Sequence, residues 1–279
     1  MNSGLKANRP RFLVYLFLTM FAVYSLFPVF WALVTSLKLP EDVVSYPPQW
    51  IPNPITFQNY IEVLTRTQIP YQILNTLIAA GVAALTVVVT SSLAGYGFSR
   101  FNFRGKNLLL LTLLACVMIS GITTVIPLYL MLYKMGLLNN LFGLAIVYSV
   151  EFIPICVWLM KSYIDTIPVE LDEAALVEGC SRFRAFISVI LPLTIPGVVC
   201  VALITFVRSA QEFIYATTFL TESNVKTSPV GLYMFFTELG VEWGQLTAAS
   251  LIIVLPIVLV FLVLQKWFVS GLTIGAVKK

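Results

Sequence analysis

Histidine is absent from this chain, and charged residues occupy only 11% of its 279 positions. The first absence removes the commonest zinc ligand and the commonest general base in proteins. The second excludes an ordinary soluble domain, in which about 25% of residues are charged. Because 59% of the residues are hydrophobic and the mean hydropathy is +0.92, the composition indicates a membrane protein.

Several functional motifs are also missing. There is no phosphate-binding loop, since the segment RGKN at 104–107 lacks both the first glycine and the hydroxyl residue of that motif. The four cysteines are widely spaced, which favours buried packing over a disulfide framework or a metal site. No nucleophile–base pair and no nucleic-acid footprint are visible. We therefore expect no catalytic residue, no metal site and no ATP hydrolysis by this chain.

Six apolar runs are long enough to cross a bilayer, for which a helix needs about 20 residues. They predict an all-α membrane protein with a single transmembrane domain over residues 1–279, ending in a tail at 269–279. The runs are 12–34, 73–94, 108–130, 141–160, 185–207 and 246–268.

Lysine and arginine are unevenly distributed among the segments that flank these runs. The N-terminal segment, the second and fourth connections and the C-terminal end hold 12 of them, whereas the other three connections hold five. Cytoplasmic segments carry the excess of lysine and arginine. We therefore expect a multi-pass protein with both termini and the loop 165–184 in the cytoplasm.

The loop 165–184 concentrates acids that are scarce elsewhere. Four of the 13 acidic residues lie between Glu170 and Glu178, in the stretch VELDEAALVEGCS. Acids in a first turn are favoured by the helix dipole, and the spacing predicts a short helix with one narrow face of small side chains. That face comprises Leu171, Ala174, Ala175 and Glu178.

The residues after this helix predict a sharp turn. Gly179 stands where a left-handed C-terminal cap occurs, and Ser181 is a suitable N-cap for a second helix that enters the membrane. Pro192 and Pro196 lie in that second helix, where proline bends it or loosens its packing. Two interpretations follow: either the small face docks on a partner protein, or the segment is a solvated surface helix.

The stretch EAALVEGCSRFRAFISVILPLTIP resembles the EAA loop of ABC-importer permeases, whose pattern is approximately E-A-A-x-x-D-G-A, a later phenylalanine and L-P-x-x-x-P. It departs from that pattern at Glu178, where Asp is usual, and at Cys180, where Ala is usual. The matching residues are Glu173, Ala174, Ala175, Gly179, Phe186, Leu191, Pro192 and Pro196.

The resemblance extends over nearly the whole chain and points to the MalG-type permeases of sugar importers, which implies the type I ABC-importer permease fold. The ending GLTIGAVKK also matches, with Lys279 where Gly is usual, whereas the W-N-E-F of the family reads Ala-Gln-Glu-Phe at 210–213. Other matching pieces are NYIEVL at 59–64, NTLIAA at 75–80, LAGYGFSRFNFRGKN at 93–107 and IPLYLMLYKMGLLNN at 126–140.

In that family the loop is a coupling helix seated in a cleft of the ATPase subunit, and the C-terminal tail reaches the ATPase dimer. The resemblance therefore implies specific contact residues. Those implied for ATPase coupling are Glu173, Ala174, Ala175, Glu178, Gly179 and Arg182. Those implied for the tail contact are Gly271, Thr273, Gly275 and Lys278.

The resemblance also implies a heteromeric complex in the inner membrane of a bacterium or archaeon. The expected partners are a homologous second permease, an ATPase homodimer that binds ATP and magnesium, and an extracytoplasmic solute-binding protein. The chain itself is expected to hold no cofactor and to bind no nucleic acid. As cargo, maltodextrins, trehalose, raffinose-type oligosaccharides, glucosylglycerol-like osmolytes and glycerol phosphates all remain open.

Glu151 lies in the fourth apolar run, and a carboxylate within a membrane span is a functional candidate. It either faces a translocation pathway or pairs with another helix or subunit. Arg208 and Glu212 are four residues apart and either pair with each other, or Arg208 pairs with Glu151. The pathway candidates are Tyr148, Glu151, Arg208, Gln211 and Glu212.

Two other classes of function fit the same apolar chain. An ion-coupled secondary transporter or channel would use Glu151 as a proton or cation site and would need no ATPase. A membrane scaffold would transport nothing. The expected function is nevertheless that of a membrane-spanning subunit of an ATP-driven importer of sugars or related polyols.

Overall fold

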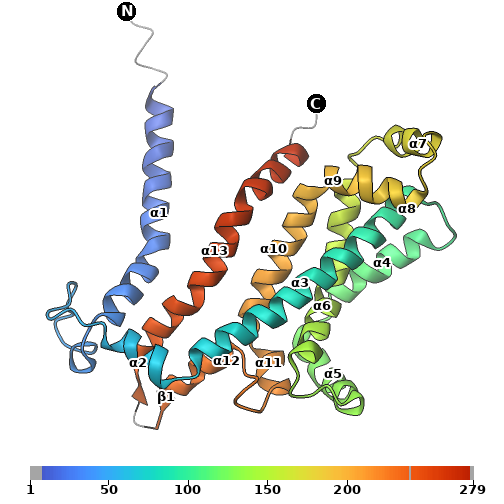
Figure 1. The fold of residues 1–279 in the computed structure, drawn as a ribbon. Helices are drawn as coiled ribbons and strands as arrows, with labels where there is room; N and C mark the ends of the chain where they lie inside the picture. The colour runs from blue at the N-terminus through green and yellow to red at the C-terminus, as the bar shows by residue number, and fades with distance from the viewer. Residues whose placement is uncertain (1–7, 239, 277–279) are drawn as a thin grey trace, which may run out of the picture. The chain divides into compact units, whose positions relative to one another are not determined.

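The computed structural model describes residues 8–238 and 240–276, with side chains at Phe12 and from Val14 to Trp267. The described chain is helical apart from its connections and one small hairpin (Figure 1). It divides into two compact units, residues 1–69 with 232–254 and residues 70–231 with 255–279.

The first unit begins with a long apolar helix, α1, whose side chains are mostly exposed. After α1 the chain is fastened by Asn59 of α2, whose buried amide donates hydrogen bonds to the carbonyl oxygens of Ser36 and Lys38 at 2.9 and 3.0 Å. The two short strands pair antiparallel. The elements are α1 (Asn8–Ser36), η1 (Pro40–Asp42), α2 (Gln58–Arg66), η3 (Leu232–Phe235), β1 (Phe236–Thr237), β2 (Gly240–Val241) and the beginning of α13 (Trp243–Ala276).

The second unit packs α3, α6 and α10 through small and medium-sized buried side chains. Ala79 of α3 belongs to one cluster with Tyr148 of α6, and Val87 belongs to a second cluster with Cys156 of α6 and Val201 of α10. Small residues let helix backbones approach closely, which is the usual way in which helices associate within membranes.

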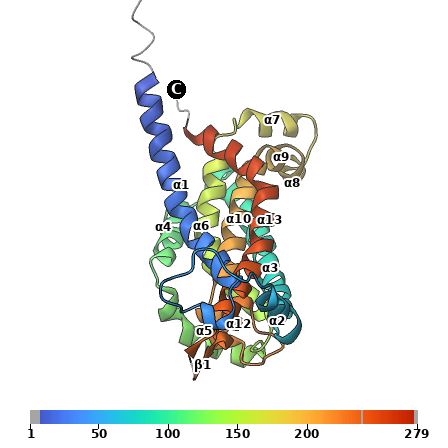
Figure 2. The same ribbon diagram turned by 90° about the vertical axis from the view of Figure 1, so that its left-hand side faces the viewer.

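Two ends of this unit matter for function. In both views α7 and α8 lie at one end of α3, and α12 lies at the other end (Figure 1 and Figure 2). The elements are α3 (Ile69–Arg100), α4 (Lys106–Val117), α5 (Gly121–Met135), α6 (Leu141–Ile164), α7 (Glu170–Val177), α8 (Arg182–Ala185), the π-helix η2 (Phe186–Ile190), α9 (Leu191–Leu193), α10 (Ile195–Gln211), α11 (Ile214–Phe219), α12 (Ser228–Gly231) and the remainder of α13.

Four of the predicted apolar runs correspond to single helices that are long and apolar enough to cross a membrane, namely α1, α3, α6 and α13. Helix α13 extends to Ala276, so the predicted tail at 269–279 is helical over its described part. The other two runs are bent pairs, and with each pair counted as one span the described part of the chain has six. The predicted all-α, six-span class is therefore confirmed.

One of the two bends was expected from the sequence, and the other was not. The run at 108–130 is interrupted at residues 118–120, where α4 and α5 meet at 100°. The run at 185–207 bends by 77° next to Thr194, between Pro192 and Pro196, as expected from prolines that lack a backbone N–H.

Candidate functional site

Helix α7 ends in the turn that the sequence predicts. Gly179 has a φ of +88°, in the left-handed region. The N–H of Cys180 donates to the carbonyl of Ala175 at 3.0 Å, and the N–H of Gly179 donates to the carbonyl of Leu176 at 3.1 Å. This pair of bonds is a Schellman motif, which satisfies carbonyls at the helix end. The next helix is capped by Ser181, whose hydroxyl accepts a 3.3 Å hydrogen bond from a backbone N–H.

The exposed and buried faces of α7 differ from those that the sequence predicts. Glu173, Ala174 and Glu178 are exposed, and so is Val177, but Ala175 is only 6% exposed. Ala175 was expected on the docking face with Ala174. It lies on the inward side instead, because three residues along a helix place it above the buried Asp172.

Asp172 fastens α7 to the end of α3. Its carboxylate accepts a 2.7 Å hydrogen bond from the Nε of Arg100, and the two side chains are only 9% and 6% exposed. It also accepts a 2.9 Å bond from the hydroxyl of Tyr96. A second nitrogen of Arg100 donates to the carbonyl of Ile167 at 2.8 Å. Sequence reasoning grouped Asp172 with the other first-turn acids and missed this role, because its partner Arg100 is 72 residues away in the chain.

A second attachment holds the start of the loop. The Ser99 hydroxyl donates to Asp165 at 2.6 Å, and Lys161 forms an ion pair with the same carboxylate. Partial burial opposes ionisation of Asp165, but these two hydrogen bonds and the positive charges of Lys161 and Lys106 together hold the pKa of the carboxyl below its usual value.

Aromatic rings pack around Tyr96, next to its hydrogen bond with Asp172. The ring of Tyr96 contacts Phe186, with centroids 4.9 Å apart, and Phe101, with centroids 6.1 Å apart. The guanidinium of Arg182, which is exposed, lies over the Phe101 ring at 5.3 Å. The phenylalanine of the motif is therefore a packing residue that supports the loop from below.

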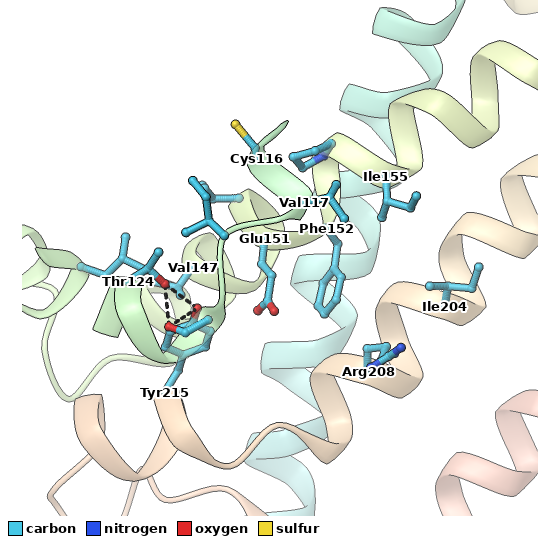
Figure 3. Close-up of a pocket in the computed structure, with 15 residues that line it drawn as sticks. Cys116, Val117, Thr124, Val147, Glu151, Phe152, Ile155, Ile204, Arg208 and Tyr215 are labelled. Carbon is cyan, nitrogen blue, oxygen red and sulfur yellow. Dashed lines mark hydrogen bonds between the residues drawn. The ribbon is translucent and has the colours of Figure 1, made fainter. Parts of the chain in front are cut away.

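A cavity of about 490 Å³ lies in the membrane part of the second unit, between the α4–α5 bend, α6, α10 and α11. Glu151 and Arg208 line it, and Figure 3 shows the Glu151 carboxylate between the Tyr215 and Arg208 side chains. The hydroxyls of Thr124 and Tyr215 are 2.8 Å apart, and Tyr215 also donates to the carbonyl of Gly121 at 3.2 Å. The walls are otherwise mainly apolar.

Only two of the five predicted pathway residues line this cavity. Tyr148 is buried at 1% exposure, and Gln211 is exposed at the end of α10 away from the lining. Glu212 accepts hydrogen bonds from the Tyr148 hydroxyl at 3.0 Å and from two backbone N–H groups of α11, those of Tyr215 and Ala216, at 2.9 and 3.1 Å.

Neither ion pair that was considered for Arg208 is present among the described side chains. Glu212 follows the last residue of α10 in an extended conformation, so helical i,i+4 geometry does not apply to it. Its carboxylate turns toward α11 and caps that helix. Arg208 and Glu151 both line the cavity without forming an ion pair within 4.0 Å in the described part of the chain.

The C-terminal candidates are only partly described. Gly271, Thr273 and Gly275 lie on α13, in the part of that helix for which only the backbone is described. Lys278 lies outside the described residues. Their predicted contact with an ATPase stays a prediction.

Comparison with known proteins decides the family. Residues 87–274 match the family model for the inner-membrane component of binding-protein-dependent transport systems. The chain belongs to this permease family. The family consists of transport components and not of enzymes, so the prediction of a permease subunit is confirmed.

Individual relatives agree with this assignment. The permease is 36% identical to the trehalose/maltose transport system permease protein MalG of Thermococcus litoralis, over 92% of this chain and 93% of that protein. It is 32% identical to the melibiose/raffinose/stachyose import permease protein MelC of Bacillus subtilis, over 90% of this chain and 91% of that protein.

A solved structure shares the fold. It belongs to a bacterial ABC transporter involved in the import of the acidic polysaccharide alginate, with a TM-score of 0.82, 20% identity, and coverage of 96% of this chain and 100% of that one. Family membership therefore favours the ABC importer over the ion-coupled transporter or channel that Glu151 had left open.

Proposed function

We propose that this permease forms half of the translocation pathway of an ATP-driven importer of sugars or related polyols. Family membership supports the transport role. The substrate class is supported by relatives named for trehalose and maltose and for melibiose, raffinose and stachyose. Binding measurements on the solute-binding protein encoded with this permease test the class: a ligand that is neither a saccharide nor a polyol would contradict it.

Energy enters, in this proposal, through the exposed face of α7. The observation that carries it is a short helix which presents Glu173, Ala174 and Glu178 outward while Asp172 holds it from behind. Glu173 would bind a basic site on the ATPase, and the small side chain of Ala174 would allow close approach. Ala175 would contribute only indirectly, by packing inward. Arg182 would lie at the edge of the same contact.

The proposed complex contains a homologous second permease, two ATPase subunits that bind ATP and magnesium, and an extracytoplasmic solute-binding protein. The C-terminal end of α13, with Gly271, Thr273, Gly275 and Lys278, would add a second ATPase contact. This arrangement requires α7 and both termini to be cytoplasmic, as the distribution of lysine and arginine predicts.

The cavity at Glu151 and Arg208 would contribute to the pathway. A carboxylate and a guanidinium without mutual pairing can each hydrogen-bond a hydroxyl-rich solute, and a mainly apolar wall suits the faces of sugar rings. The second permease would contribute the other half of the pathway around this cavity.

The coupling role is tested by Gly179→Val. A β-branched residue at φ +88° is strained, so we expect the turn after α7 to change shape and ATP-driven uptake to be lost while the protein remains in the membrane. Gly105→Val is the matched control: Gly105 has a φ of +87°, and like Gly179 it has no neighbouring atom within 4 Å of a new Cβ.

The two valine substitutions thus impose a similar backbone strain at different places in the fold. Uptake should be abolished by Gly179→Val and largely kept by Gly105→Val, measured with radiolabelled solute in cells with equal amounts of membrane-inserted protein. Wild-type uptake by the Gly179→Val variant would contradict the assignment of α7 as the coupling helix.

A further inference from the structure

Helix α3 is fastened to α7 by a buried charged pair. The Arg100–Asp172 bond of 2.7 Å, the Tyr96–Asp172 bond and the bond from Arg100 to Ile167 all join the last turn of α3 to the loop. Truncating one partner of such a pair leaves an uncompensated buried charge. Displacement of α7 therefore pulls on α3 rather than sliding past it.

The opposite end of α3 is also attached to another segment by several hydrogen bonds. The side-chain amide of Asn75 donates to the carbonyl oxygens of Asn224 and Lys226 at 2.9 and 3.0 Å. The buried hydroxyl of Thr76 lies 3.0 Å from that of Ser228 and accepts that residue's backbone N–H at 2.8 Å. These bonds attach α3 to the segment 224–228, which leads into α12 and includes its first residue.

The helix between these attachments is continuous. Among the described helices longer than 20 residues, α1, α6 and α13 each contain an interior proline, whereas α3 has none beyond its first turn. Interior prolines remove a backbone hydrogen bond and allow a kink. At a rise of 1.5 Å per residue, the 25 steps from Asn75 to Arg100 span about 38 Å.

We propose that α3 is a rigid connecting rod between the two sides of the permease, with Tyr96, Arg100 and Asp172 as positioning residues at one end and Asn75 and Thr76 at the other. The rod carries the movement of α7 to the segment 224–228 and carries binding events at that segment back to α7. The inference rests on the proposed function, because α7 is moved by an ATPase only if the coupling assignment holds.

The test uses the complete complex in proteoliposomes: both permeases, the ATPase and the solute-binding protein. ATP hydrolysis is measured with and without loaded solute-binding protein, and uptake is measured per ATP hydrolysed. Asp172→Asn alters the attachment of α3 to α7, called here the inner attachment. Asn75→Ala alters the attachment of α3 to the segment 224–228, called the outer attachment. Glu170→Gln is the inner control, since it removes an exposed acid from the same turn. Thr86→Ala is the outer control, since its exposed hydroxyl bonds only within α3.

Both attachment variants should keep basal ATP hydrolysis and lose stimulation by the solute-binding protein by about fivefold or more, the range of ordinary coupling between sites. Uptake per ATP hydrolysed should fall together with this stimulation, and both control variants should behave as wild type. Tyr96→Phe, which removes one hydroxyl and keeps the ring, should give a smaller loss even where Asp172→Asn fails to assemble.

Two results would overturn the rod. One is normal stimulation of ATP hydrolysis in Asn75→Ala when Asp172→Asn has lost that stimulation. The other is a proportional fall of hydrolysis and uptake in Tyr96→Phe or Asp172→Asn, which would leave the ratio unchanged. Failure of the proposed function is a separate result, since the wild-type complex would then show no ATP-dependent uptake at all.

Discussion

Acidic side chains in this permease separate into two kinds according to their partners. Asp172 and Glu212 each accept hydrogen bonds from several donors and hold segments together. Glu173 and Glu151 are exposed, on α7 and in the membrane cavity respectively. Since a buried polar group without a partner is costly, loss of an acid of the first kind should lower stability, whereas loss of an acid of the second kind should alter function without lowering stability.

Substitutions at Glu212 and Glu151 test that separation. Glu212→Ala leaves the Tyr148 hydroxyl and two N–H groups of α11 without their acceptor, at a cost of about 1–3 kcal/mol for each buried group. We expect a lower melting temperature of the purified complex and less protein in the membrane. Glu151→Gln should leave the melting temperature unchanged and should raise the KM for uptake.

Fluorescence-detected thermal unfolding and uptake kinetics on the same preparations distinguish the two effects. Equal destabilisation by both substitutions would mean that Glu151 is also a structural acid. An unchanged melting temperature in Glu212→Ala would mean that its capping of α11 contributes little.

The turn residues were predictable from the sequence, and the anchoring acid was not. Gly179 and Ser181 act on backbone groups within a few residues, so the local pattern contains the whole interaction. Asp172 and Glu173 are adjacent acids with the same local context. What distinguishes them is Arg100, which is 72 residues away from Asp172 in the chain.

Helix boundaries follow a similar division. The bend beside Thr194 is flanked by two prolines and could be predicted. The sharper bend at residues 118–120 contains no proline, and hydropathy does not register a change of direction inside a continuous apolar run. It is associated with a tertiary contact: Gly121 lies against the hydroxyl of Tyr215, which donates to its carbonyl.

Packing of α3 against α6 depends on Gly95. A Cβ at that position would lie 2.8 Å from the Cβ of Met160 and 2.9 Å from the backbone nitrogen of Lys161, so the helices would have to separate. Two residues away, a Cβ at Gly97 would meet nothing within 4 Å. We expect Gly95→Ala to destabilise the permease, because overpacking costs about 1–3 kcal/mol.

The same substitution at Gly97 is the matched control. Gly97→Ala should be neutral or should stabilise α3 slightly, because glycine is about 0.5–1 kcal/mol less favourable than alanine inside a helix. Melting temperatures of the two purified variants should therefore move in opposite directions or differ clearly. Equal melting temperatures would show that α3 and α6 are free to adjust at this crossing.

Orientation of the whole permease is predicted from the distribution of lysine and arginine alone. Among the five Lys and Arg residues of the lysine- and arginine-poor connections, Arg208 lies on α10 and lines the membrane cavity. Arg100, Lys106 and Lys161 of the larger set also lie on helices, so the contrast of 12 to five is left as the sequence gives it. Arg182, Arg184 and Arg104 in that set are exposed, as residues near a cytoplasmic surface should be.

Cysteine labelling checks this orientation directly. In a background without the four native cysteines, Val177→Cys places a thiol on α7, where the residue is 89% exposed, and Ser223→Cys places one in the exposed connection before α12. A membrane-impermeant maleimide added to intact cells, or to spheroplasts where an outer membrane is present, should label Ser223→Cys and spare Val177→Cys until the inner membrane is permeabilised. The reverse pattern would place α7 outside the cell, out of reach of any ATPase, and would contradict both the orientation and the coupling proposal. Labelling of both sites in intact cells would place both attachments of α3, at Asp172 and at residues 224–228, on the outer side of the membrane, and the rod proposal would fail with the orientation.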